Sequence, residues 1–366
     1  MRIIFVPLVL LAAASLLPAQ KASELGHKTG KEIFQATCVG CHGPDAKGQP
    51  ITVRGFAQEP PDFTDCNATT REAKRDWISV IHRGGPARSF SQIMPAFDEL
   101  LTDQEIGLLA EYFRTFCDPS WPQGDLNFPL AFATEKAFPE DEYVLRSSIK
   151  TTGTPRMETE LAYEKRFGKL NQIEIALPWA FDKSGKSWMG GIGDITLGYK
   201  RPVFYTMKTG TIVSLGGEIN LPTGDANRDF GLGITNFGLY VAAGQRLAKE
   251  TFLQFQMKSE LPTHPDQAPR AMSYRTAIGK SFIQDKGYGR MWTPIMEFVA
   301  DHDLGAGAKT YWDVIPQMQV TLSRRQHVRA SAGLRMPMNE RQGRDTQFVF
   351  YMLWDWFDGT LKEGWK

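Results

Sequence analysis

From Tyr143 onward, apolar and polar residues of this chain alternate with a period of two. The runs PQMQVTLS, HVRASAGLRM and FLQFQMKSEL place apolar side chains at one parity and mainly polar or charged side chains at the other. A β-strand turns successive side chains to opposite faces, whereas an amphipathic helix needs a period near 3.6. The pattern therefore predicts strands with one apolar and one polar face over residues 143 to 357.

Turn-forming clusters such as FGKLNQ, KTGT and PTGDANRDFG divide this region into about twelve runs. An even number of strands of about ten residues, joined by a mixture of short and long connections, is typical of an outer-membrane β-barrel. The expected strands lie near 143–151, 158–168, 171–180, 193–206, 210–221, 234–246, 250–261, 271–283, 290–302, 310–323, 326–337 and 345–357. We therefore expect an all-β antiparallel barrel domain at residues 143–366.

A soluble sandwich or ligand-binding barrel is the alternative, because such folds also alternate but turn the apolar face inward. The positions of the tryptophans help to distinguish a membrane barrel from these soluble folds, since membrane barrels have girdles of tryptophan near the strand ends. Most of those in this half fall near predicted strand ends: Trp179, Trp188, Trp292, Trp312, Trp354 and Trp356. We therefore favour a barrel whose apolar face meets outer-membrane lipid.

The N-terminus has the pattern of an export signal. Arg2 precedes an apolar run from Ile3 to Leu17, and small residues follow around Ala19 and Ala22. A retained anchor helix is the alternative, but the run is shorter than the roughly 20 residues that a spanning helix needs. We expect residues 1–22 to be a signal peptide, and the mature chain to be exported to an oxidising compartment.

The short stretch TCVGCHG, residues 37 to 43, carries the most specific chemistry in the chain. A Cys-x-x-Cys-His motif occurs in redox disulfides, in zinc sites and in c-type haem attachment. A structural zinc site needs four ligands, and no second Cys-x-x-Cys or His-x-x-x-His completes one. A redox motif would need a preceding strand, whereas residues 30 to 37 read as a helix. We therefore expect one haem c, attached through Cys38 and Cys41, with His42 as the proximal iron ligand.

Met94, in the stretch SFSQIMPAF, is the candidate for the second axial ligand of the iron. Pro95 follows it directly and restricts the backbone, which favours a rigid loop. A helix with an apolar face is expected after this loop, beginning at Thr102 with Glu105 completing a capping box. The rival ligand is His82, but it lies on what reads as a core helix face beginning at Trp77, so we expect it to be packed or at the surface.

Residues 25 to 117 resemble a class I monohaem cytochrome c. The resemblance rests on Gly30 and Phe34 before CVGCH, on IMPAF, and on the final helix that ends in LLAEYFRTF. It implies an all-α domain, here residues 23–117, whose first and last helices cross near the small glycine. It also implies a low-spin haem with histidine and methionine ligands that passes single electrons and binds no substrate.

Two further cysteines, Cys66 and Cys117, remain once the motif has used the other two. Thiols in an oxidising compartment form stable disulfides, so we expect these two to pair. The bond would tie the loop DFTDCNATT to the end of the last helix of the domain. The alternative is two free, buried thiols.

Residues 118–142 hold four prolines and no helical periodicity. Proline at this density favours an extended, semi-rigid connector, so we expect a linker between the two domains. Beyond it, residues 170 to 360 resemble the outer-membrane barrels of the phenol meta-pathway transporter type, through GIGDITLGYK followed by GGEINLPTGD.

The combination predicts a c-type cytochrome that carries single electrons and is tethered to the outer membrane by its barrel. Its expected partners are redox proteins of the periplasm and outer-membrane lipid. Nucleic acid is not expected, because the formal net charge is +1 and basic and acidic residues are interleaved. The alternative is an outer-membrane solute transporter or pore with a redox-sensing haem domain. We do not expect an enzyme, since no catalytic constellation is visible in the second half.

Overall fold

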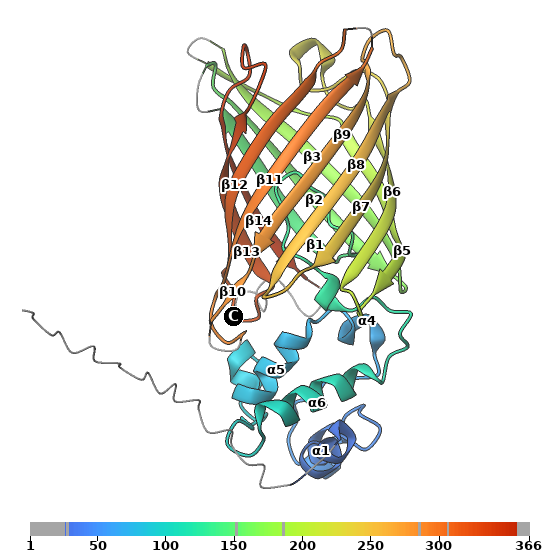
Figure 1. Cartoon of the computed structure of the whole chain (residues 1–366), viewed down its shortest axis with the longest axis vertical. Coiled ribbons are helices and arrows are strands. Elements are labelled where there is room, and N and C mark those ends of the chain that lie inside the picture. The colour runs from blue at the N-terminus through green and yellow to red at the C-terminus, as the bar shows by residue number, and fades with distance from the viewer. Residues whose placement is uncertain are drawn as a thin grey trace, which may run out of the picture.

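The computed structural model describes Gly26 and residues 29–150, 153–184, 187–284, 287–305 and 307–356. The predicted signal peptide, residues 1–22, lies outside these residues. A small helical domain lies at one end of a long β-barrel (Figure 1). Among the described residues, no helix combines the length and the apolar character needed to cross a membrane.

The helical domain packs around one aromatic and aliphatic core. Ile33 and Phe34 from the first helix meet Ile106, Leu109 and Phe113 from the last, and all five are buried. The elements are α1 (Gly30–Thr37), α2 (Val39–His42), α3 (Ile51–Arg54), α4 (Cys66–Thr69), α5 (Lys74–Arg83), the 3-10 helix η1 (Gly85–Arg88) and α6 (Asp103–Arg114). The predicted capping box at Thr102 and Glu105 begins α6.

Twelve strands within the described residues form one closed antiparallel sheet. They are β1 (Glu142–Lys150), β2 (Arg156–Phe167), β3 (Asn171–Ser184), β5 (Ile195–Thr206), β6 (Thr211–Leu221), β7 (Asn236–Arg246), β8 (Thr251–Pro262), β9 (Arg270–Lys280), β11 (Met291–Leu304), β12 (Thr310–Thr321), β13 (Val328–Pro337) and β14 (Gln347–Asp355). The pairing of β1 with β14 and of β9 with β11 closes the ring. The predicted strand number is confirmed, and the strand ends differ from the prediction by a few residues.

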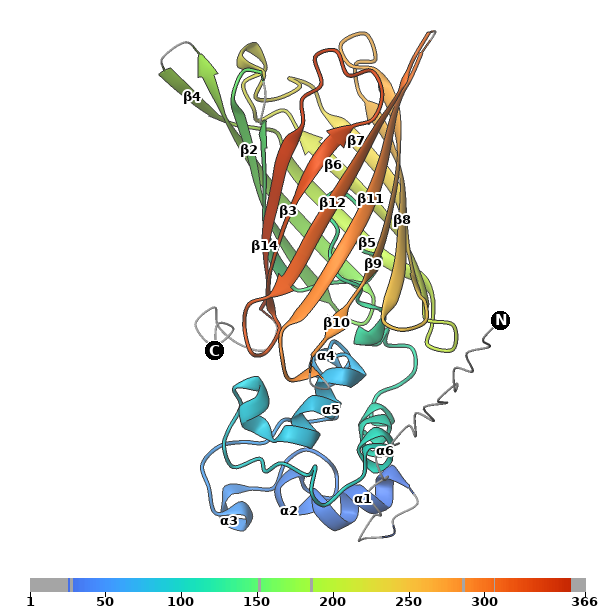
Figure 2. The same ribbon diagram turned by 60° about the vertical axis from the view of Figure 1, so that its left-hand side comes forward.

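Two short strands extend this sheet at its ends. β4 (Ser187–Ile192) pairs with β3 and projects beyond the end of the barrel far from the helices (Figure 2). β10 (Phe282–Ile283) follows β9 and pairs with β11 at the end near the helices. Neither adds a strand to the closed ring, because each continues an existing strand of the barrel.

The barrel has an apolar outer face, and its interior combines buried charged and polar side chains with buried apolar clusters. The outward side chains include Leu215, which is 50 % exposed, and Leu239, which is 58 % exposed. Others of the same kind are Ile175, Leu197, Phe255, Ile278, Phe298, Met318, Leu334 and Phe348. Glu164, Lys200 and Glu297 on the opposite strand faces are buried. A soluble sandwich would show the reverse arrangement, so that alternative is wrong and the outer face is suited to lipid.

Neighbouring residues on β5 provide a test of the two faces. Leu197 points outward, whereas the Thr196 hydroxyl donates to Asn220 Oδ1 at 2.7 Å inside the barrel. In native membranes we expect Leu197→Cys to react with a lipid-dissolved maleimide and Thr196→Cys with a water-soluble one, at least about fivefold faster in each case than with the other reagent. A water-soluble reagent that labels Leu197→Cys preferentially would contradict the membrane assignment.

The segment that precedes the first strand lies inside the barrel (Figure 1). We call residues 126–141 the plug. The sequence predicts only an extended connector here, and the structure adds that most of it occupies the half of the lumen nearest the helical domain. Phe128 stacks on Phe252 of β8 with ring centroids 5.8 Å apart, and it lies over Gly244 of β7, where a Cβ atom would be 2.7 Å from the ring.

Side chains of the lumen wall bind the backbone of the plug. Glu297 of β11 accepts from the backbone N–H groups of Ala133 and Thr134 at 3.0 and 2.5 Å. Further wall donors bond to plug carbonyl oxygens: Lys200, Ser214, Gln254, Arg275 and Tyr351. Buried backbone groups without strand partners need such bonds. The polar faces predicted from the alternation therefore hold the plug as well as pairing with one another, as Lys258 and Glu218 do at 2.7 Å.

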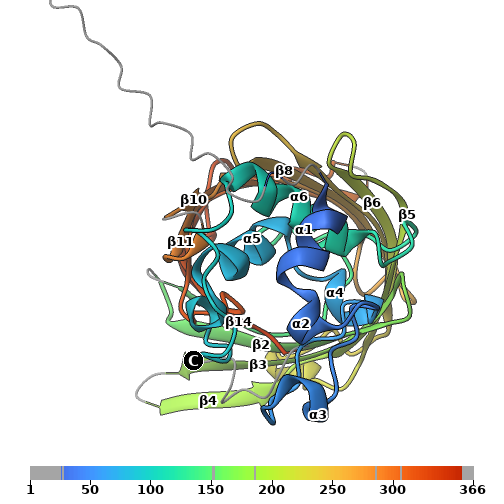
Figure 3. The ribbon, with the colours of Figure 1, turned by 90° about the horizontal axis from the view of Figure 1, so that it is seen from below.

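The helical domain lies across part of the mouth of the barrel at the end where the plug enters, as the view along the barrel axis shows (Figure 3). Charged contacts join the two parts. Arg71 forms an ion pair with Asp141 at the end of the plug, and His327 Nε2 lies 3.2 Å from Glu72 Oε1. Arg75 Nη1 lies 3.7 Å from Glu250 Oε2 in the turn after β7. The helical domain and the barrel are therefore in direct contact.

Candidate haem site

The Cys-x-x-Cys-His motif lies on one turn of helix at the end of α1. Thr29 and Glu32 form a capping box that begins this helix, with bonds of 3.2 and 2.9 Å. Cys38 ends α1 and begins α2, and its carbonyl accepts from the N–H of His42 at 2.9 Å. The structure therefore brings Cys38, Cys41 and His42 together as neighbours on one short turn.

His42 is buried against the aromatic core of the domain. Its ring stacks on Phe63 with centroids 4.8 Å apart, and Phe63 in turn stacks on Phe113 at 4.3 Å. Burial lowers the pKa of His42 to about 4, so its imidazole is neutral near pH 7, the form that binds metal. Within the described part of the chain, His42 Nδ1 has no hydrogen-bond partner.

Neither motif cysteine takes part in a disulfide. Cys38 is buried, Cys41 is partly exposed, and the Thr37 hydroxyl lies 3.3 Å from Cys38 Sγ. Burial raises the pKa of Cys38 to about 11. Redox-active Cys-x-x-Cys pairs have thiol pKa values below the ordinary range. The shift at Cys38 has the opposite direction.

Met94 lies on the loop between η1 and α6, and its side chain is half buried. Its carbonyl accepts from the N–H of Gly85 at 3.0 Å. Gly84 has a φ of 79°, and a Cβ atom there would lie 2.8 Å from the Met94 oxygen, so a larger residue would push the loop away. Sequence analysis missed these two glycines, although GGP in front of the loop is a turn signal. Ligation by Met94 stays a prediction.

His82, the rival ligand, lies near the end of α5 and is buried. Its Nε2 is 3.4 Å from Asp103 Oδ1, and its Nδ1 is 3.8 Å from Asp98 Oδ2. Two carboxylates therefore face the imidazole. This environment agrees with a packed histidine rather than an iron ligand.

The crossing of α1 and α6 sets the frame of the site. A Cβ atom at Gly30 would lie 2.2 Å from the backbone oxygen of Leu108 and 2.8 Å from Tyr112 Cβ. Phe34 then contacts the rings of Tyr112 and Phe113 at 5.5 and 5.9 Å. The close crossing implied by the resemblance is present, and it depends on a residue without a side chain.

Cys66 and Cys117 form a disulfide with Cα atoms 5.5 Å apart and a sequence separation of 51. It joins the start of α4 to the segment just after α6. A loop of that length corresponds to roughly 4 kcal/mol of stabilisation in the chain-entropy description. The bond also fixes the point from which the chain continues toward the plug.

The donor set and the surroundings fit a c-type haem. Two thiols and a neutral imidazole on one turn supply the covalent and proximal contacts that such a haem needs. Trp77 packs edge-on against Phe63 at 5.5 Å, and its buried Nε1 has no acceptor among the described residues. An indole N–H in a core is a donor suited to a polar group of a bound ligand. Bound haem would supply an iron that gains or loses one electron.

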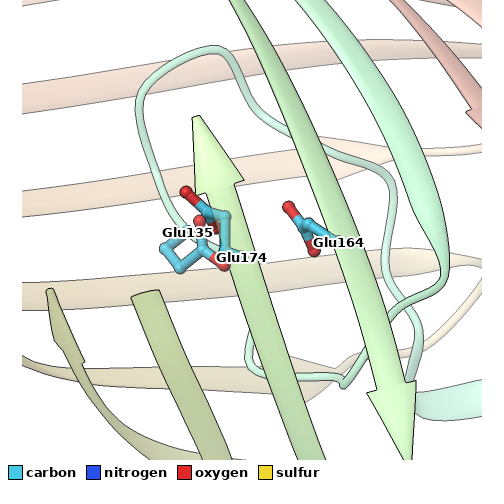
Figure 4. A group of neighbouring side chains, drawn as sticks. All are labelled: Glu135, Glu164 and Glu174. Atoms are coloured by element: carbon cyan, nitrogen blue, oxygen red, sulfur yellow. The ribbon is translucent and has the colours of Figure 1, made fainter. Parts of the chain in front are cut away.

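A second group of chemically capable residues lies in the lumen (Figure 4). Glu135 of the plug, Glu164 of β2 and Glu174 of β3 each offer a carboxylate oxygen within 4.8 Å of the others. Sequence analysis missed this group because its members come from three separate segments. Lys200 Nζ lies 2.6 Å from Glu135 Oε1, so a cation of the chain already meets the cluster. The ion pair of Glu135 with Lys200, whose Nζ also donates to the carbonyl of Lys136, helps to hold the plug.

The fold and the motif together define an N-terminal cytochrome c domain followed by a closed antiparallel barrel of twelve strands. Residues 26–113 match the family described as Cytochrome C oxidase, cbb3-type, subunit III. Among curated proteins, none matches the chain.

Solved structures of porins and channels share features of the barrel. An outer membrane channel from Pseudomonas putida F1 is 14 % identical, over 62 % of this chain and 99 % of that one, with a TM-score of 0.43. A KdgM porin in complex with disordered oligogalacturonate is 9 % identical, over 58 % of this chain and 98 % of that one, with a TM-score of 0.39. A NanC porin is 10 % identical, over 58 % of this chain and 97 % of that one, with a TM-score of 0.39.

Proposed function

We propose that this protein is a c-type cytochrome that carries single electrons at the periplasmic face of the outer membrane, with the barrel as its anchor. The observation that carries the proposal is the placement of Cys38, Cys41 and His42 on one helical turn at the aromatic core of a cytochrome c domain. The residues serve electron transfer rather than turnover of a substrate.

Each residue of the site has a distinct role in this proposal. Cys38 and Cys41 would hold the haem covalently as thioethers, and His42 would supply a ligand to its iron. Met94 would supply a second ligand, a thioether, from the loop whose backbone packs against Gly84 and Gly85. Methionine as axial ligand raises the reduction potential of a haem. The stacked rings of Phe63 and Phe113 keep water from the imidazole side of the site.

The plug favours an anchor over an open pore. Four large apolar side chains of the plug are almost fully buried among apolar side chains of the lumen wall: Leu126, Phe128, Leu130 and Phe138. Burial of such a side chain contributes about 1.5–3 kcal/mol, so the four together contribute roughly 6–12 kcal/mol. This apolar burial, together with the hydrogen bonds from the lumen wall, offsets part of the conformational entropy that the segment loses when it is ordered. It supports an anchor over an open solute pore.

The lengths of the turns support a periplasmic position for the cytochrome domain. The barrel has short turns at the end next to the helices, at residues 168–170, 207–210 and 247–250. Longer connections, 222–235 and 338–346, lie at the far end. Outer-membrane barrels have short turns on the periplasmic side and longer loops outside. This asymmetry, with the apolar outer face, supports an outer membrane in which the site faces the periplasm.

One haem does not carry electrons across an apolar band about 25 Å tall. The proposed role therefore needs soluble or membrane-bound redox proteins in the periplasm as donor and acceptor. A cytochrome that is fixed at one membrane surface would collect or deliver electrons there, whereas a free cytochrome diffuses through the compartment. Export through the predicted signal peptide belongs to the same proposal.

Spectroscopy of the haem tests the proposal directly. We expect a pyridine haemochrome spectrum of the covalent c type, and its loss in the double variant Cys38→Ser, Cys41→Ser. A weak sulfur-to-iron band near the red end of the oxidised spectrum should disappear in Met94→Ala, and the potential should fall. His82→Ala serves as the control and should leave the band unchanged. A b-type spectrum in the unaltered protein would refute the proposal.

A further inference from the structure

Two turns of the barrel contact the cytochrome domain beside the loop that carries Met94. One follows β10 and includes Gly287 and Gly289, and the other joins β12 to β13. Gln326 of the second turn is buried, and its Nε2 donates to the carbonyl oxygens of Gly287 and Gly289 at 3.0 and 2.9 Å. The two turns therefore present one joined surface to the helices.

Gly287 meets the cytochrome domain at η1. A Cβ atom at this glycine would lie 3.4 Å from Arg88 Nη2 and 3.5 Å from Ser79 Cβ. Arg88 is 2 % exposed, and its Nη2 donates to Asp76 Oδ1 at 2.8 Å. The start of the methionine loop is thus enclosed between α5 and the barrel.

Arg325 reaches further along the same loop. Its guanidinium carbon lies 4.7 Å from the centroid of the Phe90 ring. The N–H of Phe90 donates to the Gly85 carbonyl at 2.9 Å, and the N–H of Gly85 donates to the Met94 carbonyl at 3.0 Å. A continuous path of contacts therefore runs from the barrel to the backbone of Met94.

We propose that Arg325 is a positioning residue for the methionine ligand: from the barrel, it holds the loop that carries Met94. This rests on the proposed function, in which Met94 binds the haem iron. An arginine over an aromatic face attracts it through the ring quadrupole. Docking on the barrel thereby restricts the loop and favours the closed arrangement in which Gly85 bonds to Met94.

Competition by an added ligand measures this restriction. Imidazole binds ferric iron in place of methionine, so its apparent affinity rises as the loop is held less firmly. For Arg325→Ala we expect imidazole to bind about two- to fivefold more tightly in the full-length ferric protein, the range expected for an exposed cation–π contact. Arg325→Lys keeps a cation and should restore most of the difference.

Matched variants separate this contact from a general effect of charge. Phe90→Leu keeps an apolar side chain but removes the ring, so it should match Arg325→Ala, and the double variant should add nothing further. Lys208→Ala removes an exposed positive charge from another turn at the same end of the barrel and should leave imidazole binding unchanged. Heat-modifiable gel mobility confirms in each case that the barrel is folded.

The outcomes distinguish this inference from the proposed function. An unaltered protein without the sulfur-to-iron band would show that Met94 is not the ligand, and the proposed function would need revision. An unaltered protein with the band, together with an Arg325→Ala variant whose imidazole affinity is unchanged, would overturn the positioning role alone. An equal change in Lys208→Ala would also overturn it, because charge rather than the ring contact would then be responsible.

Discussion

Gly30→Val is expected to prevent the cytochrome domain from folding while the barrel remains intact. The first atom of any side chain at this position would lie 2.2 Å from the backbone oxygen of Leu108. Overpacking of a core commonly costs about 1–3 kcal/mol. The conflict here involves backbone of α6, which cannot rotate away as a side chain can. We therefore expect a loss of more than about 3 kcal/mol, a large part of the stability of a small domain.

The measurement is the amount of covalent haem per folded barrel, from haem staining and heat-modifiable mobility of the full-length protein. Gly107→Ala on α6 is the matched control, because a Cβ atom there meets nothing within 4 Å. Alanine in a helix interior is more favourable than glycine by about 0.5–1 kcal/mol, so this variant should retain its haem. Normal haem content in Gly30→Val would show that the helices do not cross at this glycine.

The strands of the barrel could be predicted because their signal is local. Each strand alternates apolar and polar residues, and turn residues separate the strands, so strand number and face follow from short windows of sequence. β5 is an example: the sequence predicts residues 193–206, and the strand is Ile195–Thr206. The residues of β10 lie inside the run predicted at 271–283, which the structure divides into β9 and β10. The short extension β4 is not predicted, since it continues β5 without a clear pattern of its own.

The plug could not be predicted, because its contacts join residues far apart in the sequence. Thr134 bonds to Glu297, and Gln254 bonds to the carbonyl of Pro129. Nothing in either segment alone indicates its partner. The prolines correctly excluded regular structure, but an irregular segment can lie in solvent or inside a barrel. Gly244 leaves room for Phe128 on the lumen side of β7, but a glycine within a strand also occurs at bulges and tight bends, so it did not point to a buried ring.

The candidate haem site also has one part that could be predicted from the sequence and one part that could not. Cys38, Cys41 and His42 form a contiguous motif whose chemistry follows from its spacing. The supporting groups come from elsewhere: Phe63 from the loop before α4 and Trp77 from α5. Their roles depend on tertiary packing that no local pattern specifies. The contact of Arg325 with Phe90 joins two domains and was equally beyond prediction.

Replacement of the plug is expected to turn a closed barrel into a conducting one. In the unaltered protein, apolar side chains of the plug pack against the lumen wall in the half nearest the cytochrome domain. The backbone of the plug is hydrogen-bonded to side chains of β3, β5, β6, β8, β11 and β14. We expect its ion flux in planar bilayers to be at the level of the leak. A Gly-Ser segment of equal length in place of residues 128–139 loses the apolar packing and should hydrate the polar lumen wall.

For that variant we expect the ion flux to rise by at least about an order of magnitude, as in barrels with a water-filled lumen. Ala131→Ser is the matched control, because it alters one small buried side chain of the plug and should keep the barrel closed. Heat-modifiable mobility must be the same in all three proteins, so that flux is compared between folded barrels. If the unaltered protein already conducts as strongly as the variant, the plug does not seal the lumen, and the barrel is a pore that carries a cytochrome domain rather than an anchor for it.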